Sequence, residues 1–252
     1  DGTSYRMLDL NFPTVDPADP LRLTDEEEEL LHTLELSFRH NARLHEHVRF
    51  LYSNGSMYKC CNSNLLYHGC IPMTENREFD GLMVGGKMYR GKELMDFIDT
   101  QVKNAYFLPE DAPEKEACRD FMWYLWNGAK SPVFGKDKNR SFEHYFIEDP
   151  EVMRETMNPY YQLSEEEETC DMILKEFGLP TKGSHIINGH MPVKIKSGET
   201  PIRAGGKLFI IDGGLSKAYQ ERTGIAGYTL IFNSHHLALA EHKPFDPERE
   251  RT

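Results

Sequence analysis

Two histidines in this chain follow short apolar runs and precede a turn that contains proline. His190 lies in Asn188-Gly-His-Met-Pro192, and His68 lies in Leu66-Tyr-His-Gly-Cys-Ile-Pro72. Neutral imidazole is the commonest transition-metal ligand among protein side chains. A buried strand that stops at a glycine turn presents the next side chain at the edge of a sheet, where α/β proteins bind ligands. We therefore expect both histidines at one metal site, with Gly189 supplying the unusual backbone of its turn.

The elements that must position these histidines are strands and helices in alternation. Apolar runs bounded by turn residues predict strands, and two of the runs form a hairpin around Asn62–Asn64. Helical spacing predicts four helices, the first of them long and buried on one face. Thr24 with Glu27 and Ser164 with Glu167 have the spacing of capping boxes, which predicts the starts of the first and the last helix. The expected strands are residues 57–61, 65–67, 185–188, 207–211, 228–232 and 237–240, and the expected helices are residues 24–51, 94–105, 111–126 and 164–178. This order indicates an α/β protein.

Composition excludes several classes of partner. The formal net charge of -12 argues against a nucleic-acid or anionic membrane surface, so we expect neither partner. The sequence contains no run of eighteen apolar residues, so we predict no transmembrane helix. The five cysteines form no C-x-x-C pair, which favours small buried thiols in a reducing cytoplasm over zinc ligands.

A basic loop stands out in this acidic chain. Residues 130–140 contain Phe134-Gly-Lys136 and end at Arg140. Such a loop is either solvated or binds an anionic ligand, and the sequence leaves both interpretations open. The preceding aromatic stretch Trp123-Tyr-Leu-Trp126 favours core packing over a ligand pocket. The histidines of residues 32–47 and 235–242 lack any metal-ligand spacing and are expected to be surface or packing residues.

These motifs together resemble those of the calcineurin-like metallophosphatases. Leu66-Tyr-His-Gly-Cys-Ile-Pro72 is similar to their H-G-G/C-x-P motif, and Asn188-Gly-His-Met-Pro192 is similar to their later G-H motif. Ile211-Asp-Gly-Gly214 and Thr223-Gly-Ile-Ala-Gly-Tyr-Thr-Leu230 resemble the strands that close the fold in bacterial members. Pro192 stands where many metallophosphatases have a second histidine, as in the protein-phosphatase-like branch. The resemblance implies a β-sandwich flanked by helices, with a helical insertion at about residues 87–178 between the two metal-ligand motifs.

Within that superfamily the chain resembles the class III fructose-1,6-bisphosphatases of Firmicutes-type bacteria. Tyr5-Arg-Met-Leu-Asp-Leu-Asn-Phe-Pro13, the aromatic and basic segments at Trp123–Trp126 and Phe134–Lys136, and the stretch Ile187–Phe245 carry this likeness. The resemblance implies hydrolysis of fructose 1,6-bisphosphate to fructose 6-phosphate in gluconeogenesis, in the cytoplasm, with two manganese or magnesium ions. His68 and His190 would bind one of these ions.

The early motifs of the superfamily, G-D-x-H, G-D-x-x-D-R and G-N-H-D/E, are absent from the chain. They carry most metal ligands and the catalytic residues, so we expect those residues upstream of Asp1, on a missing amino-terminal segment of the same enzyme. The chain alone is then expected to be inactive. Basic groups would hold the second phosphate of the sugar bisphosphate. The candidates are Lys136, Arg140, Lys194 and Arg203.

The expected organisation is an extended connector at residues 1–23, the carboxy-terminal part of the phosphatase domain at residues 24–245, and a charged tail at residues 246–252. A homo-oligomer is compatible with this organisation. Two other functions remain open. One is a metallophosphatase that acts on a phosphoprotein or a dinucleoside polyphosphate. The other is a folded segment without catalysis, which serves interaction or assembly.

Overall fold

The computed structural model describes residues 3–225 and 227–243, and it is a mixed α/β structure, as the sequence predicts. The charged tail expected at residues 246–252 lies outside the described residues. The chain divides into two units. One is the chain up to Ser56 with Asn139–Glu155, and the other is Met57–Lys138 with the described residues from Thr156 onward. None of the described helices is long and apolar enough to span a bilayer.

The smaller unit is helical. Its elements are α1 (Asp25–Arg39), α2 (Ala42–Asn54), α5 (Glu143–Phe146) and α6 (Pro150–Met153). Thr24 caps α1 in the capping box that the sequence predicts. The single long helix expected over residues 24–51 is wrong, because the Asn41 side chain accepts from the backbone N–H of Leu44 and starts a second helix. The buried face is wrong too, since neither α1 nor α2 contains a buried residue.

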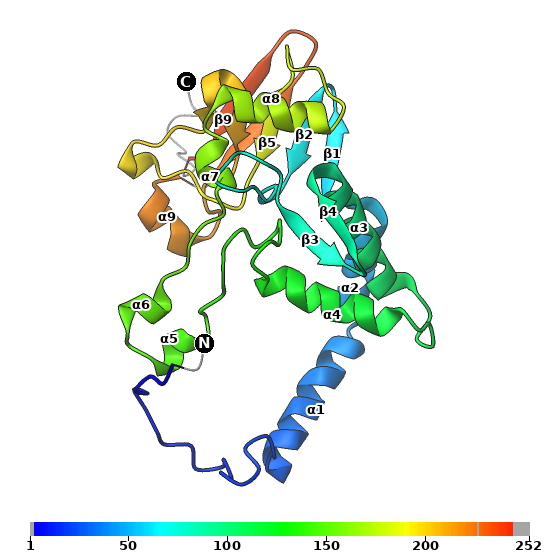
Figure 1. Cartoon of the computed structure of the whole chain (residues 1–252), viewed down its shortest axis with the longest axis vertical. Helices are drawn as coiled ribbons and strands as arrows, with labels where there is room; N and C mark the ends of the chain where they lie inside the picture. The colour runs from blue at the N-terminus through cyan, green and yellow to red at the C-terminus, as the bar shows by residue number, and fades with distance from the viewer. Residues whose placement is uncertain (1–2, 226, 244–252) are drawn as a thin grey trace, which may run out of the picture. The chain divides into compact units, whose positions relative to one another are not determined.

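The larger unit carries both histidine motifs, and Figure 1 shows its strands and helices. Its strands are β1 (Tyr58–Cys61), β2 (Asn64–Tyr67), β3 (Gly81–Val84), β4 (Lys87–Arg90), β5 (Ile186–Asn188), β6 (Ile202–Arg203), β7 (Leu208–Ile210), β8 (Tyr228–Phe232) and β9 (Leu237–Glu241). Its helices are α3 (Gly91–Phe107), α4 (Lys115–Asn127), α7 (Tyr160–Leu163), α8 (Glu167–Glu176) and α9 (Lys217–Thr223), with short 3-10 turns at Ile195–Ser197 and Ala204–Gly206.

A five-stranded sheet in the order β1-β2-β5-β7-β6 organises this unit. The hairpin β1–β2 is antiparallel, and its turn residues Asn62 and Ser63 have positive φ, as a tight two-residue turn requires. Strands β2, β5 and β7 are parallel, with Leu66 beside Ile187 and Ile187 beside Phe209. Their carboxyl ends therefore meet at one edge of the sheet.

The main core joins this sheet to α8. Leu65 and Ile186 of the sheet and Ile173 and Leu174 of α8 are completely buried in one cluster, and Figure 1 shows α8 across the strands. Burying such side chains stabilises the fold by about 1.5–3 kcal/mol each. The sheet edge that carries the histidines is thus anchored to a rigid core.

Two details of the sequence analysis need correction. Ser164 does not cap α8: it is the C-cap residue of α7, and α8 begins at Glu167 with Glu166 as its N-cap residue. The prediction that the thiols are buried holds for Cys70, Cys118 and Cys170 only. All five cysteines are free, but Cys60 and Cys61 are exposed on the edge strand β1.

Candidate metal centre

Three polar side chains follow the three parallel strands at the same edge. His68 comes directly after β2, His190 comes two residues after β5, and Asp212 comes two residues after β7. The backbone N–H of Gly189 donates to the carbonyl of His68 at 2.9 Å, which joins the first two turns. The turn after β5 is joined to the one after β7 by Val193, whose N–H donates to the Asp212 carbonyl at 2.8 Å.

The two histidines lie together, although 122 positions separate them in the chain. His190 Nδ1 is 3.2 Å from His68 Nε2, and the rings meet edge to face at 76°. Two nitrogens that share one ion through bonds of 2.0–2.1 Å lie about 2.8–3.4 Å apart for ligand angles between octahedral and tetrahedral. The observed separation fits this range. It also suits a hydrogen bond between the rings when no ion is bound.

The other nitrogen of His190 faces a backbone carbonyl. Its Nε2 is 3.2 Å from the oxygen of Phe134, which can only accept, so the proton sits on Nε2 and the lone pair sits on Nδ1. Metal-binding histidines commonly have such a partner, which fixes the tautomer and the ring orientation. Burial lowers the pKa of His190, and His68 and Lys136 lower it further against the opposing effects of Phe134 and Asp212. The imidazole is therefore neutral near pH 7.

The backbone of this turn differs from the expectation. Gly189 does not have a positive φ, whereas His190 itself lies in the left-handed region at φ 65°. A residue with a side chain pays about 1–2 kcal/mol for this conformation, and such strain concentrates at functional sites. Neither backbone conformation nor space requires glycine at position 189, since an added Cβ would lie at an ordinary contact distance of 3.6 Å from the Asp212 Cβ.

Gly69, after the other histidine, has a different role. A Cβ at Gly69 would lie only 2.2 Å from the carbonyl oxygen of Pro132. The same oxygen accepts from the Cys70 N–H at 2.8 Å, so the loop around Pro132 rests directly on the His68 turn. This loop continues to Phe134, whose carbonyl faces His190. The basic loop thus forms one wall of the histidine site.

The four basic candidates lie in different surroundings. Lys136 is close enough to His190 to lower its pKa, and it lines an open cavity of about 700 Å³ together with Lys130. Lys194 and Arg203 line a smaller cavity of about 120 Å³, which Gly189 also lines. Arg140 belongs to the smaller unit, where its guanidinium donates to Glu143 at 2.6 Å.

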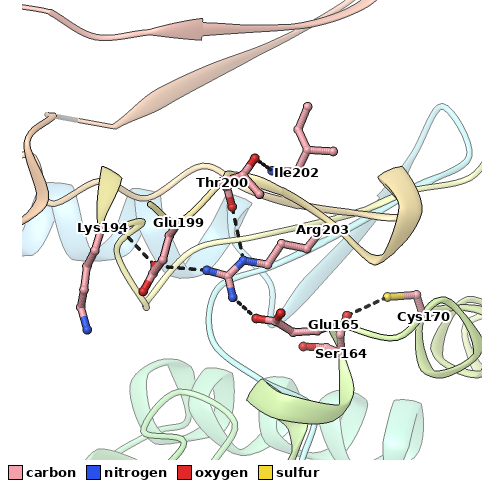
Figure 2. A network of polar contacts seen from close by, with 8 residues as sticks. All are labelled: Ser164, Glu165, Cys170, Lys194, Glu199, Thr200, Ile202 and Arg203. Atoms are coloured by element: carbon pink, nitrogen blue, oxygen red, sulfur yellow. Dashed lines mark hydrogen bonds and ion pairs between the residues drawn. The ribbon is translucent and has the colours of Figure 1, made fainter. Parts of the chain in front are cut away.

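Arg203 has its guanidinium engaged on three sides (Figure 2). Nη1 pairs with the carboxylate of Glu165, Nη2 donates to Glu199 at 3.2 Å, and Nε donates to the Thr200 carbonyl at 3.3 Å. Glu199 also accepts from the backbone N–H of Lys194 at 3.1 Å. The guanidinium therefore fastens the loop after His190 to the start of the α8 segment.

Asp212 is the residue of this edge that the sequence analysis does not single out as a site residue. Its signal was the same pattern, an apolar run followed by a polar residue and glycines in Ile211-Asp-Gly-Gly214. One carboxylate oxygen accepts from the Gly214 N–H at 2.8 Å. In the described part of the chain no three histidine, cysteine or acidic side chains cluster closely enough to hold an ion. The described residues therefore offer a pair of imidazoles with an acid nearby, not a complete ligand set.

Comparison with known proteins identifies the family of this chain. The family model described as Firmicute fructose-1,6-bisphosphatase matches residues 1–251. Three curated relatives carry the name fructose-1,6-bisphosphatase class 3. The protein of Bacteroides fragilis is 52% identical over 97% of this chain and 37% of its own length. Those of Finegoldia magna and Fusobacterium nucleatum are 50% and 52% identical, each over 97% of this chain and 38% of its own length.

The chain thus spans somewhat more than a third of the length of these curated relatives. No solved structure matches it. A match of the family model over nearly all residues, supported by half-identical relatives, settles the family. The chain belongs to the Firmicute fructose-1,6-bisphosphatase family.

Proposed function

We propose that His68 and His190 are ligands of one divalent ion in an enzyme that hydrolyses fructose 1,6-bisphosphate to fructose 6-phosphate and phosphate. The observation that carries this proposal is the 3.2 Å between His190 Nδ1 and His68 Nε2, in a chain of this family. The resemblance favours manganese or magnesium, with two ions in the complete site. Such ions would supply Lewis acidity toward the phosphate and lower the pKa of a bound water.

The chain's own residues would prepare this site. The Phe134 carbonyl holds the proton of His190 on Nε2 and leaves Nδ1 free to bind. Burial keeps that imidazole neutral, as a metal ligand must be. Lys136 is the best supported of the basic candidates for the sugar bisphosphate, because it is near His190 and lines the 700 Å³ cavity. Its ammonium would balance the charge of a phosphate held there.

We further propose that residues 1–252 supply only part of the active site. Two neutral imidazoles bring no negative charge, and two dications near each other need carboxylates to hold them. The remaining ligands would come from polypeptide other than these residues. The five-stranded sheet would then be part of a calcineurin-like sandwich, and the five free thiols suit a reducing cytoplasm.

A complementation assay tests this proposal. The chain is assayed for phosphate release from fructose 1,6-bisphosphate with Mn²⁺, alone and with the part of the Bacteroides fragilis relative that this chain does not match. We expect no turnover alone, turnover in combination, and loss of turnover with H68A or H190A. A phosphopeptide and a dinucleoside tetraphosphate serve as competing substrates. Turnover by the chain alone, or equal rates on a competing substrate, would contradict the proposal.

A further inference from the structure

A buried tyrosine touches both segments that carry the histidines. Tyr160 opens α7 and has no exposed surface. Its hydroxyl lies 2.6 Å from the hydroxyl of Tyr67 and accepts from Nδ2 of Asn188 at 2.8 Å. Tyr67 directly precedes His68, and Asn188 lies two residues before His190. One hydroxyl therefore connects the last residue of β2 to the last residue of β5.

The chain around Tyr160 is fixed to the same turns through its backbone. The side-chain oxygen of Asn158 accepts from the N–H groups of Met73 and Tyr160, at 3.1 and 3.0 Å. The Asn158 N–H donates to the Gly135 carbonyl at 2.9 Å. The segment thus holds the chain after the His68 turn and the loop that faces His190. Tyr160 has little freedom to move away from its two partners.

The sheet itself does not fix the histidines to each other. The ladder between β2 and β5 pairs Leu65 with Ile186 and Leu66 with Ile187, and it ends there. Beyond it, the Gly189 N–H donates to the His68 carbonyl, and His190 Nδ1 lies beside His68 Nε2. Asn188, at the end of β5, donates to the Tyr160 hydroxyl. Nδ2 of Asn188 also reaches the Gly69 carbonyl at 3.3 Å, but its side-chain oxygen has no partner among the described residues. Of the two hydrogen bonds that hold the Asn188 amide, the one to the Tyr160 hydroxyl is therefore the shorter.

We propose that Tyr160 is a positioning residue of the metal centre, whose hydroxyl sets the separation between His68 Nε2 and His190 Nδ1. This rests on the proposed function, because it assumes that the two nitrogens bind one ion. The ring of Tyr160 belongs to the core, whereas the hydroxyl serves the two strand ends. Loss of the hydroxyl would let the Asn188 side chain and the turn after it shift, and would widen the range of nitrogen separations.

The test measures binding of Co²⁺ to the chain by its visible absorption, with Cys60 and Cys61 replaced by serine in every sample to remove exposed thiols. We expect Y160F to weaken binding by about 10-fold or more, as loss of groups that support metal ligands commonly does. The control is Y58F, since Tyr58 donates its own hydrogen bond to Asp96 on α3 at 2.8 Å. This variant loses a bonded hydroxyl of the same kind and should bind Co²⁺ within 2-fold of the parent.

A double-mutant cycle distinguishes positioning from general destabilisation. Because the two hydroxyls form one link, Y67F should also weaken binding, and Y67F/Y160F should be no weaker than Y160F. NMR spectra that correlate imidazole protons with ring nitrogens, recorded without metal, should show altered His190 nitrogen chemical shifts in Y67F and in Y160F. The same shifts in Y58F should match those of the parent. If Y160F does not fold, Y67F carries the same test. Additive losses, or parent-like affinity in folded Y160F and Y67F, would overturn the role of Tyr160. If H190A leaves Co²⁺ binding of the parent unchanged, the metal site itself fails instead.

Discussion

Two glycines beside the two histidines should respond to alanine in opposite ways. Neither Gly69 nor Gly189 has a positive φ, so alanine suffers no conformational penalty at either position. The difference lies in the space available. A Cβ at Gly69 would meet the Pro132 carbonyl oxygen at 2.2 Å, whereas the nearest atom to a Cβ at Gly189 is 3.6 Å away. G69A and G189A therefore form a matched pair of substitutions.

The magnitude follows from the contact that must be relieved. An ordinary contact begins near 3.4 Å, so the Pro132 backbone has to retreat by about 1.2 Å from the Gly69 turn. Overpacking of this kind costs about 1–3 kcal/mol, and the hydrogen bond from the Cys70 N–H to the same oxygen adds about 1 kcal/mol if it breaks. We expect G69A to lower the free energy of unfolding by about 2–4 kcal/mol. G189A should instead raise it by about 0.4–1 kcal/mol, because alanine fits the native backbone and restricts the unfolded chain.

Urea unfolding followed by circular dichroism measures both variants under the same conditions. Imidazole NMR adds a local measurement, since the displaced loop carries the Phe134 carbonyl that faces His190. G69A should shift the His190 Nε2 resonance, and G189A should leave its proton on the same nitrogen. If G69A is as stable as the parent, or if G189A is equally damaging, the packing of the loop on the His68 turn is wrong.

Two further predictions concern residues away from the histidine pair. R203A should lower the free energy of unfolding by about 1–3 kcal/mol, because it removes hydrogen bonds to two carboxylates and one carbonyl. Urea unfolding measures this change, and K196A, which alters an exposed lysine of the same region, is measured beside it. Burial raises the pKa of the Cys70 and Cys170 thiols to about 12, so at pH 8 both stay protonated. Iodoacetamide should label the exposed Cys60 in the native state, although burial also raises its pKa, and these two thiols only after unfolding. Equal rates in the native state would contradict the burial.

The sequence predicts the position of the histidine site from short patterns alone. An apolar run followed by a histidine, a glycine and a proline marks a strand end, and parallel strands bring such ends to one edge. The patterns at His68 and His190 are therefore enough to expect the two rings together. Asp212 follows the same rule, but an aspartate before two glycines is also an ordinary turn signal, so it is less distinctive.

Other features depend on contacts that no local pattern contains. Gly189 was expected to supply the special backbone of its turn, but His190 adopts it, because neighbouring turns fix the chain on both sides. Ser164 and Glu167 have the spacing of a capping box, yet Ser164 is the C-cap residue of α7 and α8 starts only at Glu167. Asn41 interrupts a pattern that reads as one helix, since an N-cap residue is also tolerated inside a helix. In each case tertiary packing or a neighbouring element decides between two locally permitted structures.

The segment between the two histidine motifs has a structural task that its composition conceals. Its aromatic residues suggested core packing, and its basic residues suggested either an anion site or a solvated loop. In the structure this segment returns to the sheet edge twice, at Phe134 with its carbonyl on His190 and at Tyr160 with its hydroxyl between the strand ends. Both contacts come from residues far from the histidines in sequence, so neither could be inferred from the histidine motifs. Because surrounding contacts hold side chains in place, this segment is part of what gives the two imidazoles a common geometry.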